Sequence, residues 1–187
     1  LTLNNLRHKI TLRTDGGIKT GRDVVIAAMM GAEEYGVATT ALVAMGCIMV
    51  RQCHSNTCPV GACTQDEKLR EKFNGTPDKV VNLFTFIAQE VREILSELGF
   101  KSLNEIIGRT DLLRQVSKGS PNLDDLDLNP LFVRADPGKN KRYCEKQIIN
   151  FVPDTLDQEI WPEINKKIDN NEKIEKSYQI ENTHRAV

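Results

Sequence analysis

Three closely spaced cysteines carry the most specific chemistry in this chain. They stand at Cys47, Cys53 and Cys58, with five and then four residues between them, and Pro59 follows the third. Thiolates gathered over so short a segment bind soft metal ions and iron–sulfur clusters readily. The segment is therefore predicted to hold a metal centre of this kind.

Iron–sulfur and zinc are the main alternatives for these cysteines. Structural zinc sites favour cysteine pairs separated by about two to four residues and use four ligands, a pattern that the present spacings fit poorly. Three ligands would suit a [3Fe–4S] cluster, and a fourth from Cys63 would suit [4Fe–4S]. On the spacings alone, a zinc-stabilised structural module and a set of free buried thiols both stay open.

A glycine-rich turn is the second candidate site. Asp15, Gly16 and Gly17 follow a predicted strand and precede a predicted helix, where glycines allow backbone N–H groups to approach a phosphate. A second strand end, at Ala38 and Thr39, opens another helix. In (β/α)8 barrels the loops after the last two strands often bind phosphate, so the two turns together predict such a site. Helix capping is the structural alternative for Thr39.

Hydrophobic patterning indicates the elements that must position these residues. We predict strands at 9–13 and 35–39 and helices at 21–31 and 40–45, the first capped by Thr20. This order is typical of α/β organisation with a parallel sheet. Apolar residues spaced by three and four predict an amphipathic helix from Asp78 to Leu98, ended by Gly99. Further predictions are helices at 66–73, 102–107 and 157–168, a strand at 178–180, and a long irregular connection beyond Gly119.

Composition excludes several classes of protein. The 187 residues are 40% hydrophobic and 27% charged, with a net charge of −1, so nothing favours nucleic acid or an anionic membrane as partner. The longest uncharged stretch, from Tyr35 to Val50, is shorter than the roughly 20 apolar residues of a membrane span. Five cysteines without a secretory context argue against a disulfide framework. We therefore expect a location in the cytoplasm, with a plastid as the alternative.

The two candidate sites together resemble a known family. The run from Thr14 to Gly61, TDGGIKTGRDVVIAAMMGAEEYGVATTALVAMGCIMVRQCHSNTCPVG, is similar to the large (alpha) subunit of glutamate synthases. The similarity continues through IIGRTDLL at 106–113 and, less sharply, to the end of the chain. The cysteine block is the part most specific to that family.

This resemblance implies an enzyme that uses FMN and a [3Fe–4S] cluster to make glutamate from glutamine and 2-oxoglutarate. It identifies Cys47, Cys53 and Cys58 as the cluster ligands and Cys63 as a nearby thiol that is not a ligand. It assigns the FMN phosphate to Asp15, Gly16 and Gly17 together with Ala38 and Thr39, although many relatives carry glycine where this chain has Ala38. The electron donor it implies is either ferredoxin or an NAD(P)H-linked partner subunit. Another FMN-dependent barrel oxidoreductase is the alternative.

The resemblance also implies a domain organisation. Residues 1–113 correspond to the last βα units of a (β/α)8 barrel with the iron–sulfur loop at 47–63, residues 114–155 to an irregular connection, and residues 156–187 to the start of a C-terminal β-helix domain. The glutaminase domain and the residues that bind 2-oxoglutarate are expected to lie outside this sequence. The chain by itself is therefore expected to be inactive.

Overall fold

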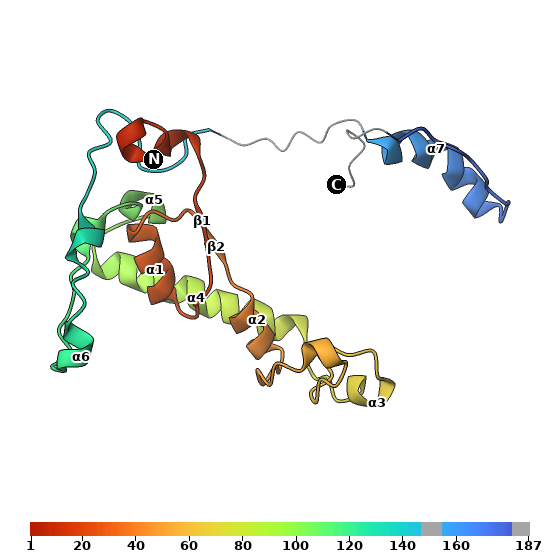
Figure 1. The fold of residues 1–187 in the computed structure, drawn as a ribbon, viewed down its shortest axis with the longest axis horizontal. Coiled ribbons are helices and arrows are strands. Elements are labelled where there is room, and N and C mark those ends of the chain that lie inside the picture. The colour runs from red at the N-terminus through yellow and green to blue at the C-terminus, as the bar shows by residue number, and fades with distance from the viewer. Residues whose placement is uncertain (147–154, 181–187) are drawn as a thin grey trace. The chain divides into compact units, whose positions relative to one another are not determined.

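A parallel strand–helix–strand segment organises the first part of the structure (Figure 1). The computed structural model describes residues 1–146 and 155–180, which belong to two units, Leu1–Lys146 and Gln147–Val187. In the first unit, strand β1 (Arg13–Asp15) and strand β2 (Glu34–Gly36) pair in parallel, with Thr14 opposite Tyr35, and helix α1 (Gly21–Met29) connects them. The predicted α/β organisation with a parallel sheet is confirmed.

The first strand begins later than the sequence predicts. Residues Arg7–Lys9 form a 3-10 helix in place of the start of the predicted strand at 9–13. The reason is Arg7, which is buried and whose guanidinium donates to the carbonyl oxygens of Ile10 and Gly31, both at 2.8 Å. These bonds hold the backbone in a turn, so extended pairing starts only at Arg13. The second strand, predicted at 35–39, ends at Gly36, and helix α2 (Thr39–Ala44) begins at the last residue of the predicted strand.

The start of α1 is fixed by its own sequence. The hydroxyl of Thr20 accepts a hydrogen bond from the backbone N–H of Asp23 at 3.2 Å, and the carboxylate of Asp23 accepts one from the N–H of Thr20 at 3.0 Å. A hydrogen bond from the N–H of Lys19 is the main cause that lowers the pKa of Asp23. This reciprocal capping confirms Thr20 as the predicted N-cap.

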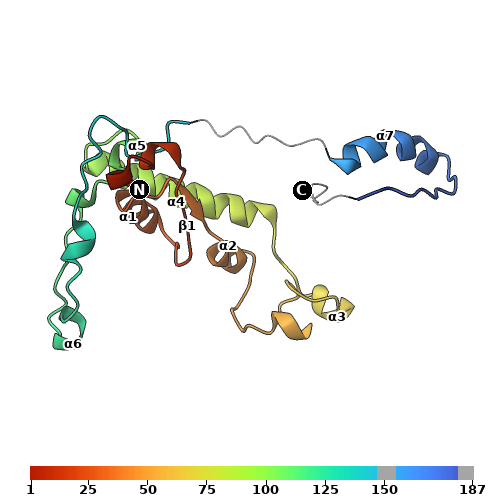
Figure 2. The ribbon, with the colours of Figure 1, turned by 45° about the horizontal axis from the view of Figure 1, so that its top comes forward.

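The core lies between α1 and the long helix α4 (Pro77–Glu97), which pack against each other in both views (Figures 1 and 2). Ala28 in α1 and Ile106 in helix α5 (Leu103–Ile106) are fully buried there. The buried cluster as a whole contains Ile18, Val24, Val25, Ala28, Met29, Ile87, Val91, Leu95 and Ile106. The predicted helix at 78–98 is confirmed, with proline at its first position and Gly99 in the left-handed region at a φ of 78°.

The remaining elements of the first unit are short. Helices α3 (Glu67–Arg70) and α6 (Pro121–Asp124) span four residues each, and the predicted helix at 66–73 is therefore shorter than expected. The helices predicted at 40–45 and 102–107 correspond to α2 and α5. Other 3-10 helices lie at Thr2–Asn4, Cys53–Ser55, Thr110–Leu112 and Asn129–Phe132.

The described part of the second unit contains one helix, α7 (Leu156–Asp169), as predicted for 157–168. Thr155 and Gln158 form a capping box at its start. The prediction of a strand at 178–180 is wrong, because residues 172–180 carry no regular secondary structure. Among the helices of residues 1–146 and 155–180, none combines the length and apolar character that crossing a bilayer requires.

Candidate functional site

The two predicted phosphate turns line one cavity. It has a volume of about 120 Å3 and lies where β1 and β2 end, at the carboxyl side of the parallel pair. All five residues proposed from the sequence line it, and they are Asp15, Gly16, Gly17, Ala38 and Thr39. The parallel pairing explains this, because the carboxyl ends of neighbouring parallel strands meet at the same edge of a sheet.

The turns are held together by contacts that fix the shape of the cavity. Gly16 and Gly17 adopt φ values of 91° and 73°, a backbone conformation that side chains disfavour. The hydroxyl of Thr40 donates to the carbonyl oxygen of Ile18 at 2.9 Å and so ties the start of α2 to the first turn. The carboxyl group of Asp15 covers Gly36, where an added β-carbon would stand 2.7 Å from its Cγ. The cavity therefore has a fixed backbone outline.

The N-terminus of α1 contributes less to this cavity than the sequence suggests. The N–H groups of Lys19 and Thr20 both donate to Asp23, and the N–H of Gly21 donates to the carboxylate of Glu90 at 2.7 Å. These first-turn donors are thus engaged within the chain. Residues 15–19 line the cavity from the turn after β1, and the exposed Lys19 is the one positively charged residue among them. Neither Lys19 nor Glu90 was singled out by sequence reasoning.

The cysteine loop is organised by one asparagine. Asn56 adopts a φ of 60°, and its side-chain oxygen accepts hydrogen bonds from the N–H of Gln65 at 2.6 Å and the hydroxyl of Thr64 at 3.0 Å. The same hydroxyl also approaches the carbonyl oxygen of Asn56 at 2.7 Å. Because these bonds join residue 56 to residues 64–65, the segment between them forms a closed loop that contains Cys58 and Cys63.

Cys58 is the buried member of the loop and is surrounded by backbone donors. The N–H group of Cys63 is the first cause that lowers the pKa of Cys58, and the N–H groups of Val60, Ala62 and Gly61 act in the same direction. Donors arranged in this way favour the thiolate, which is the form of cysteine that binds metals. The chemistry of Cys58 thus suits the ligand role assigned from the sequence.

Cys63 is the fourth cysteine of this region. Its pKa is raised, first by the charge of Cys53. The charges of Cys58 and Cys47 act in the same direction. Cys53 and Cys63 are exposed, whereas Cys47 is half-buried. Sequence reasoning treated Cys63 as a neighbour, and its regular spacing was the available signal that it belongs here.

Two further observations define the cysteine region. Within residues 1–146 and 155–180, no group of three or more His, Cys, Asp or Glu side chains has an arrangement that could hold a metal ion. An iron–sulfur cluster interposes several iron and sulfide ions between its ligand sulfurs, so its ligands stand further apart than those of a single ion. Cys144 lies elsewhere, with its N–H bonded to Glu33 at 2.8 Å and its thiol directed at the carbonyl oxygen of Lys146.

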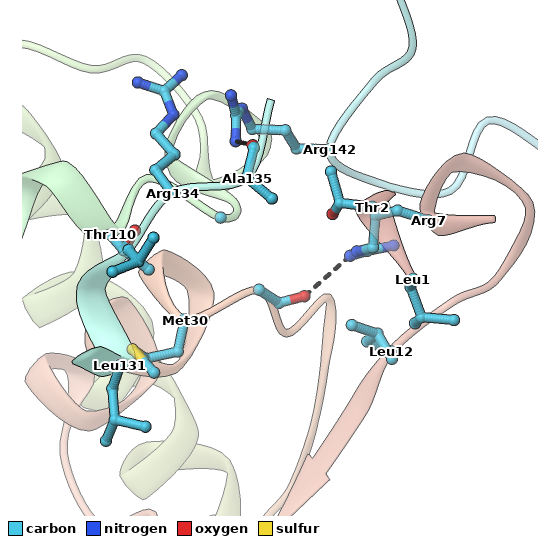
Figure 3. Close-up of a pocket in the computed structure, with 13 residues that line it drawn as sticks. Leu1, Thr2, Arg7, Leu12, Met30, Thr110, Leu131, Arg134, Ala135 and Arg142 are labelled. Atoms are coloured by element: carbon cyan, nitrogen blue, oxygen red, sulfur yellow. Dashed lines mark hydrogen bonds between the residues drawn. The ribbon is translucent and has the colours of Figure 1, made fainter. Parts of the chain in front are cut away.

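A separate cavity of about 310 Å3 lies beside the N-terminal segment (Figure 3). Arg7 reaches into it and bonds Gly31, as the dashed line marks, while its guanidinium pairs with the carboxylate of Glu33 at 2.7 Å. Arg134 and Arg142 stand together on another side. Burial and the charge of Arg134 lower the pKa of Arg142. None of the residues assigned to phosphate or cluster binding lines this cavity.

Comparison with known proteins places the sequence in a defined context. Residues 1–101 match the family model described as a conserved region in glutamate synthase. The chain is 66% identical over its whole length to the NADPH glutamate synthase large chain of Azospirillum brasilense. It is 46% identical over 98% of its length to ferredoxin-dependent glutamate synthase 2 of a Synechocystis strain, and 53% identical over 72% to the NADH glutamate synthase of Schizosaccharomyces pombe. It spans 12%, 12% and 6% of these relatives.

Proposed function

Because the chain belongs to the glutamate synthase family, we propose that it forms part of an enzyme that makes L-glutamate reductively from L-glutamine and 2-oxoglutarate. The observation that carries this proposal is the 66% identity over all 187 residues of this chain to 12% of a glutamate synthase large chain. Residues 1–113 would be the last βα units of its (β/α)8 barrel, residues 114–155 a connection, and residues 156–187 the start of a β-helix domain. The parallel β1–α1–β2 unit supports the barrel assignment.

The cavity at the ends of β1 and β2 is the proposed site for the phosphate of FMN. The glycine backbone at Gly16 and Gly17 would let N–H groups approach the phosphate oxygens, and Lys19 would add a positive charge. The turn at Ala38 and Thr39 would close the site from the second strand. The carboxylate of Asp15 would repel a phosphate, so we assign it to accept hydrogen bonds from hydroxyl groups of the cofactor.

Cys47, Cys53 and Cys58 are the proposed ligands of a [3Fe–4S] cluster. The chemistry of the donor set fits this group, since three cysteines stand within residues 47–58 and backbone N–H groups lower the pKa of the Cys58 thiol. When bound, the cluster and FMN would supply the electron transfer of the reaction. The protein residues would hold these groups, and the N–H groups around Cys58 would offset the negative charge on its sulfur.

The partners of the intact enzyme follow from this proposal. Its small-molecule substrates would be 2-oxoglutarate and ammonia derived from glutamine. The relative that is 66% identical is named as an NADPH enzyme, which favours an NAD(P)H-linked partner subunit over ferredoxin as electron donor. We propose a cytoplasmic location, with a plastid as the alternative. Neither nucleic acid nor a membrane is proposed as a partner.

Anaerobic purification with spectroscopy tests the cofactors directly. We expect visible absorption that dithionite bleaches, an EPR signal in the oxidised state, three irons per chain and bound FMN. Cys58→Ser should remove most of the iron, while Cys144→Ser, a cysteine outside the loop, should retain it. A colourless protein that holds one tightly bound zinc would instead support the structural-module alternative and overturn the cluster assignment. Flavin without glutamate formation in the full-length enzyme would favour another FMN-dependent oxidoreductase.

A further inference from the structure

The cavity beside the N-terminal segment lies at the opposite end of the parallel strands from the proposed phosphate cavity. It is lined by Leu12, which directly precedes β1, and by Gly31, which lies between α1 and β2. The amino ends of both strands are therefore next to it, whereas the proposed phosphate cavity lies at their carboxyl ends. The two cavities share no lining residue, so they are separate candidate sites.

Positive charge gathers in this cavity (Figure 3). Within the part of the chain that the structure describes, the charged side chains that line it are Arg7, Arg134 and Arg142. Arg7 is neutralised, because its guanidinium pairs with the carboxylate of Glu33 at 2.7 Å and donates to two carbonyl oxygens. Arg134 and Arg142 are the two cations that could receive a ligand.

Arg134 shares its carboxylate partner with another arginine. Asp111 accepts hydrogen bonds from the guanidinium of Arg109 at 2.9 and 2.8 Å, and Arg134 approaches the same carboxylate at 3.2 Å. One negative charge therefore offsets two positive charges at this place. A guanidinium has five N–H donors, so Arg134 keeps donors for a further anion.

Arg142 is half-buried, and packing holds it in place. An added β-carbon at Gly108 would stand 3.6 Å from the Cβ and Cδ atoms of Arg142, so the stem of the side chain lies against this glycine. Its guanidinium donates to a neutral partner, the carbonyl oxygen of Ala135, at 3.2 Å. Burial and the charge of Arg134 lower the pKa of Arg142, and nearby carboxylates offset only part of this effect. An anion bound beside Arg142 would reduce this electrostatic cost.

We propose that this cavity binds the phosphate or carboxylate group of a small molecule through the guanidinium groups of Arg134 and Arg142. The planar guanidinium matches the geometry of either group with two parallel N–H donors. The volume of about 310 Å3 is within the range of cavities that take small ligands. Leu12, Met30 and Val133 also line it and would contact the apolar part of such a molecule. The inference goes beyond the proposed function and requires neither FMN nor a cluster.

Anion titrations of the full-length protein test the proposal. Isothermal titration calorimetry at constant ionic strength, with inorganic phosphate and separately with acetate, shows which group binds more tightly. We expect Arg142→Gln to weaken binding of that anion by about ten-fold or more, because it removes a charged donor. Arg142→Lys keeps the charge but loses the planar fork, so its affinity should lie between those of wild type and the glutamine variant. Arg92→Gln, at an exposed position outside the cavity, is the matched control and should bind like wild type.

Asp111→Asn tests the same site in the opposite direction and leaves both arginines in place. It removes the carboxylate that competes for Arg134, so the anion should bind more tightly to this variant than to wild type. Unchanged or weaker binding would contradict the argument from charge, even if Arg142→Gln did not fold.

Three further outcomes would overturn the proposal. Wild-type protein that binds neither anion would exclude an anion site, and equal affinities of Arg142→Gln and Arg92→Gln would place the anion elsewhere. If Lys19→Gln abolishes binding and Arg142→Gln does not, the anion binds in the cavity after β1 and β2 instead. The iron and flavin content of the wild type tests the proposed function independently of these titrations, so the two failures are distinguishable.

Discussion

The carboxylate of Glu90 accepts a hydrogen bond from the backbone N–H of Gly21 at 2.7 Å, across 69 positions of sequence. This bond joins the middle of α4 to the first residue of α1, directly after the turn that lines the proposed phosphate cavity. The bond therefore holds the start of α1, which Thr20 caps, against α4. The same contact occupies a donor that an anion would otherwise use.

Gly21 should be intolerant of a side chain because α4 approaches it closely. A β-carbon at this position would stand 2.7 Å from the backbone nitrogen of Val91 and 2.8 Å from the carbonyl oxygen of Ile87. We expect Gly21→Ala to lower the free energy of unfolding by about 1–3 kcal/mol, even though alanine favours helices. Urea denaturation followed by circular dichroism measures this. The adjacent exposed residue offers a control, and Arg22→Ala should change stability by less than about 0.5 kcal/mol. Equal stability of the two variants would contradict the close packing.

Local sequence patterns predicted the helices well and the first strand poorly. The spacing of Ile87, Val91 and their neighbours identified α4 almost to the residue, because one helix face must be buried whatever its partner is. The start of β1 depended on Arg7, whose side chain turns inward to pair with Glu33. That pairing joins residues distant in sequence, and the alternation of side-chain types along residues 9–13 gives no indication of it.

The candidate sites likewise combine features that the sequence predicts with contacts that it does not. Glycines after a strand are visible in the sequence, and the five predicted residues do line one cavity. The occupation of the Gly21 N–H by Glu90 and the closure of the cysteine loop by Asn56 and Gln65 arise from packing and loop closure. Such contacts are set by how the chain folds back on itself, so the spacing of residue types alone could not predict them.

Removing the hydroxyl of Thr40 should loosen the proposed phosphate cavity. Thr40→Val keeps the shape of the side chain but loses the bond to the carbonyl oxygen of Ile18, a contact of about 1 kcal/mol. If the FMN-bound state loses the energy of this hydrogen bond, the affinity for FMN should fall by roughly five-fold. Fluorescence titration of the deflavinated protein with FMN measures the change.

A second threonine supplies the control for this measurement. Thr85 in α4 donates its hydroxyl to the carbonyl oxygen of Val81 at 2.8 Å, and it does not line the cavity. Thr85→Val therefore removes the same kind of bond and should leave the FMN affinity unchanged. A similar loss of affinity in both valine variants would indicate general destabilisation rather than a local effect on the cavity.

The pairing of Asp111 should make part of the stability depend on pH. A hydrogen bond from Arg109 is the main cause that lowers the pKa of Asp111 from 3.8, and Arg134 also pairs with the carboxylate, at 3.2 Å. A lowered pKa in the folded state means that the stabilisation is present above pH 3.8 and is lost as the pH falls below it. Asp111→Asn should therefore reduce stability at pH 7, and the difference from wild type should shrink toward pH 3.

Urea midpoints for wild type and variant across about pH 3 to 7 measure this difference. The effect should be small and should weaken in high salt, since the carboxylate is partly exposed. Asp125→Asn serves as the control, because Asp125 is exposed. A destabilisation by Asp111→Asn that stays constant over this range would exclude the ion pairs as its origin.

The outer face of α4 should make the isolated 187-residue chain prone to association. Val81 is 60% exposed and lines a groove of about 550 Å3 on this helix together with Phe84 and Ala88. Contiguous apolar surface of this kind binds hydrophobic dyes and promotes association in water. Val81→Glu should therefore lower the fluorescence of bound ANS and shift the sedimentation profile toward monomer. Its unfolding midpoint should change little, because the exposed side chain contributes little to the core. Leu95→Ala, which removes a buried side chain of the same helix, should instead lower the midpoint and raise dye binding. Unchanged association of the Val81→Glu variant would show that this face does not drive it.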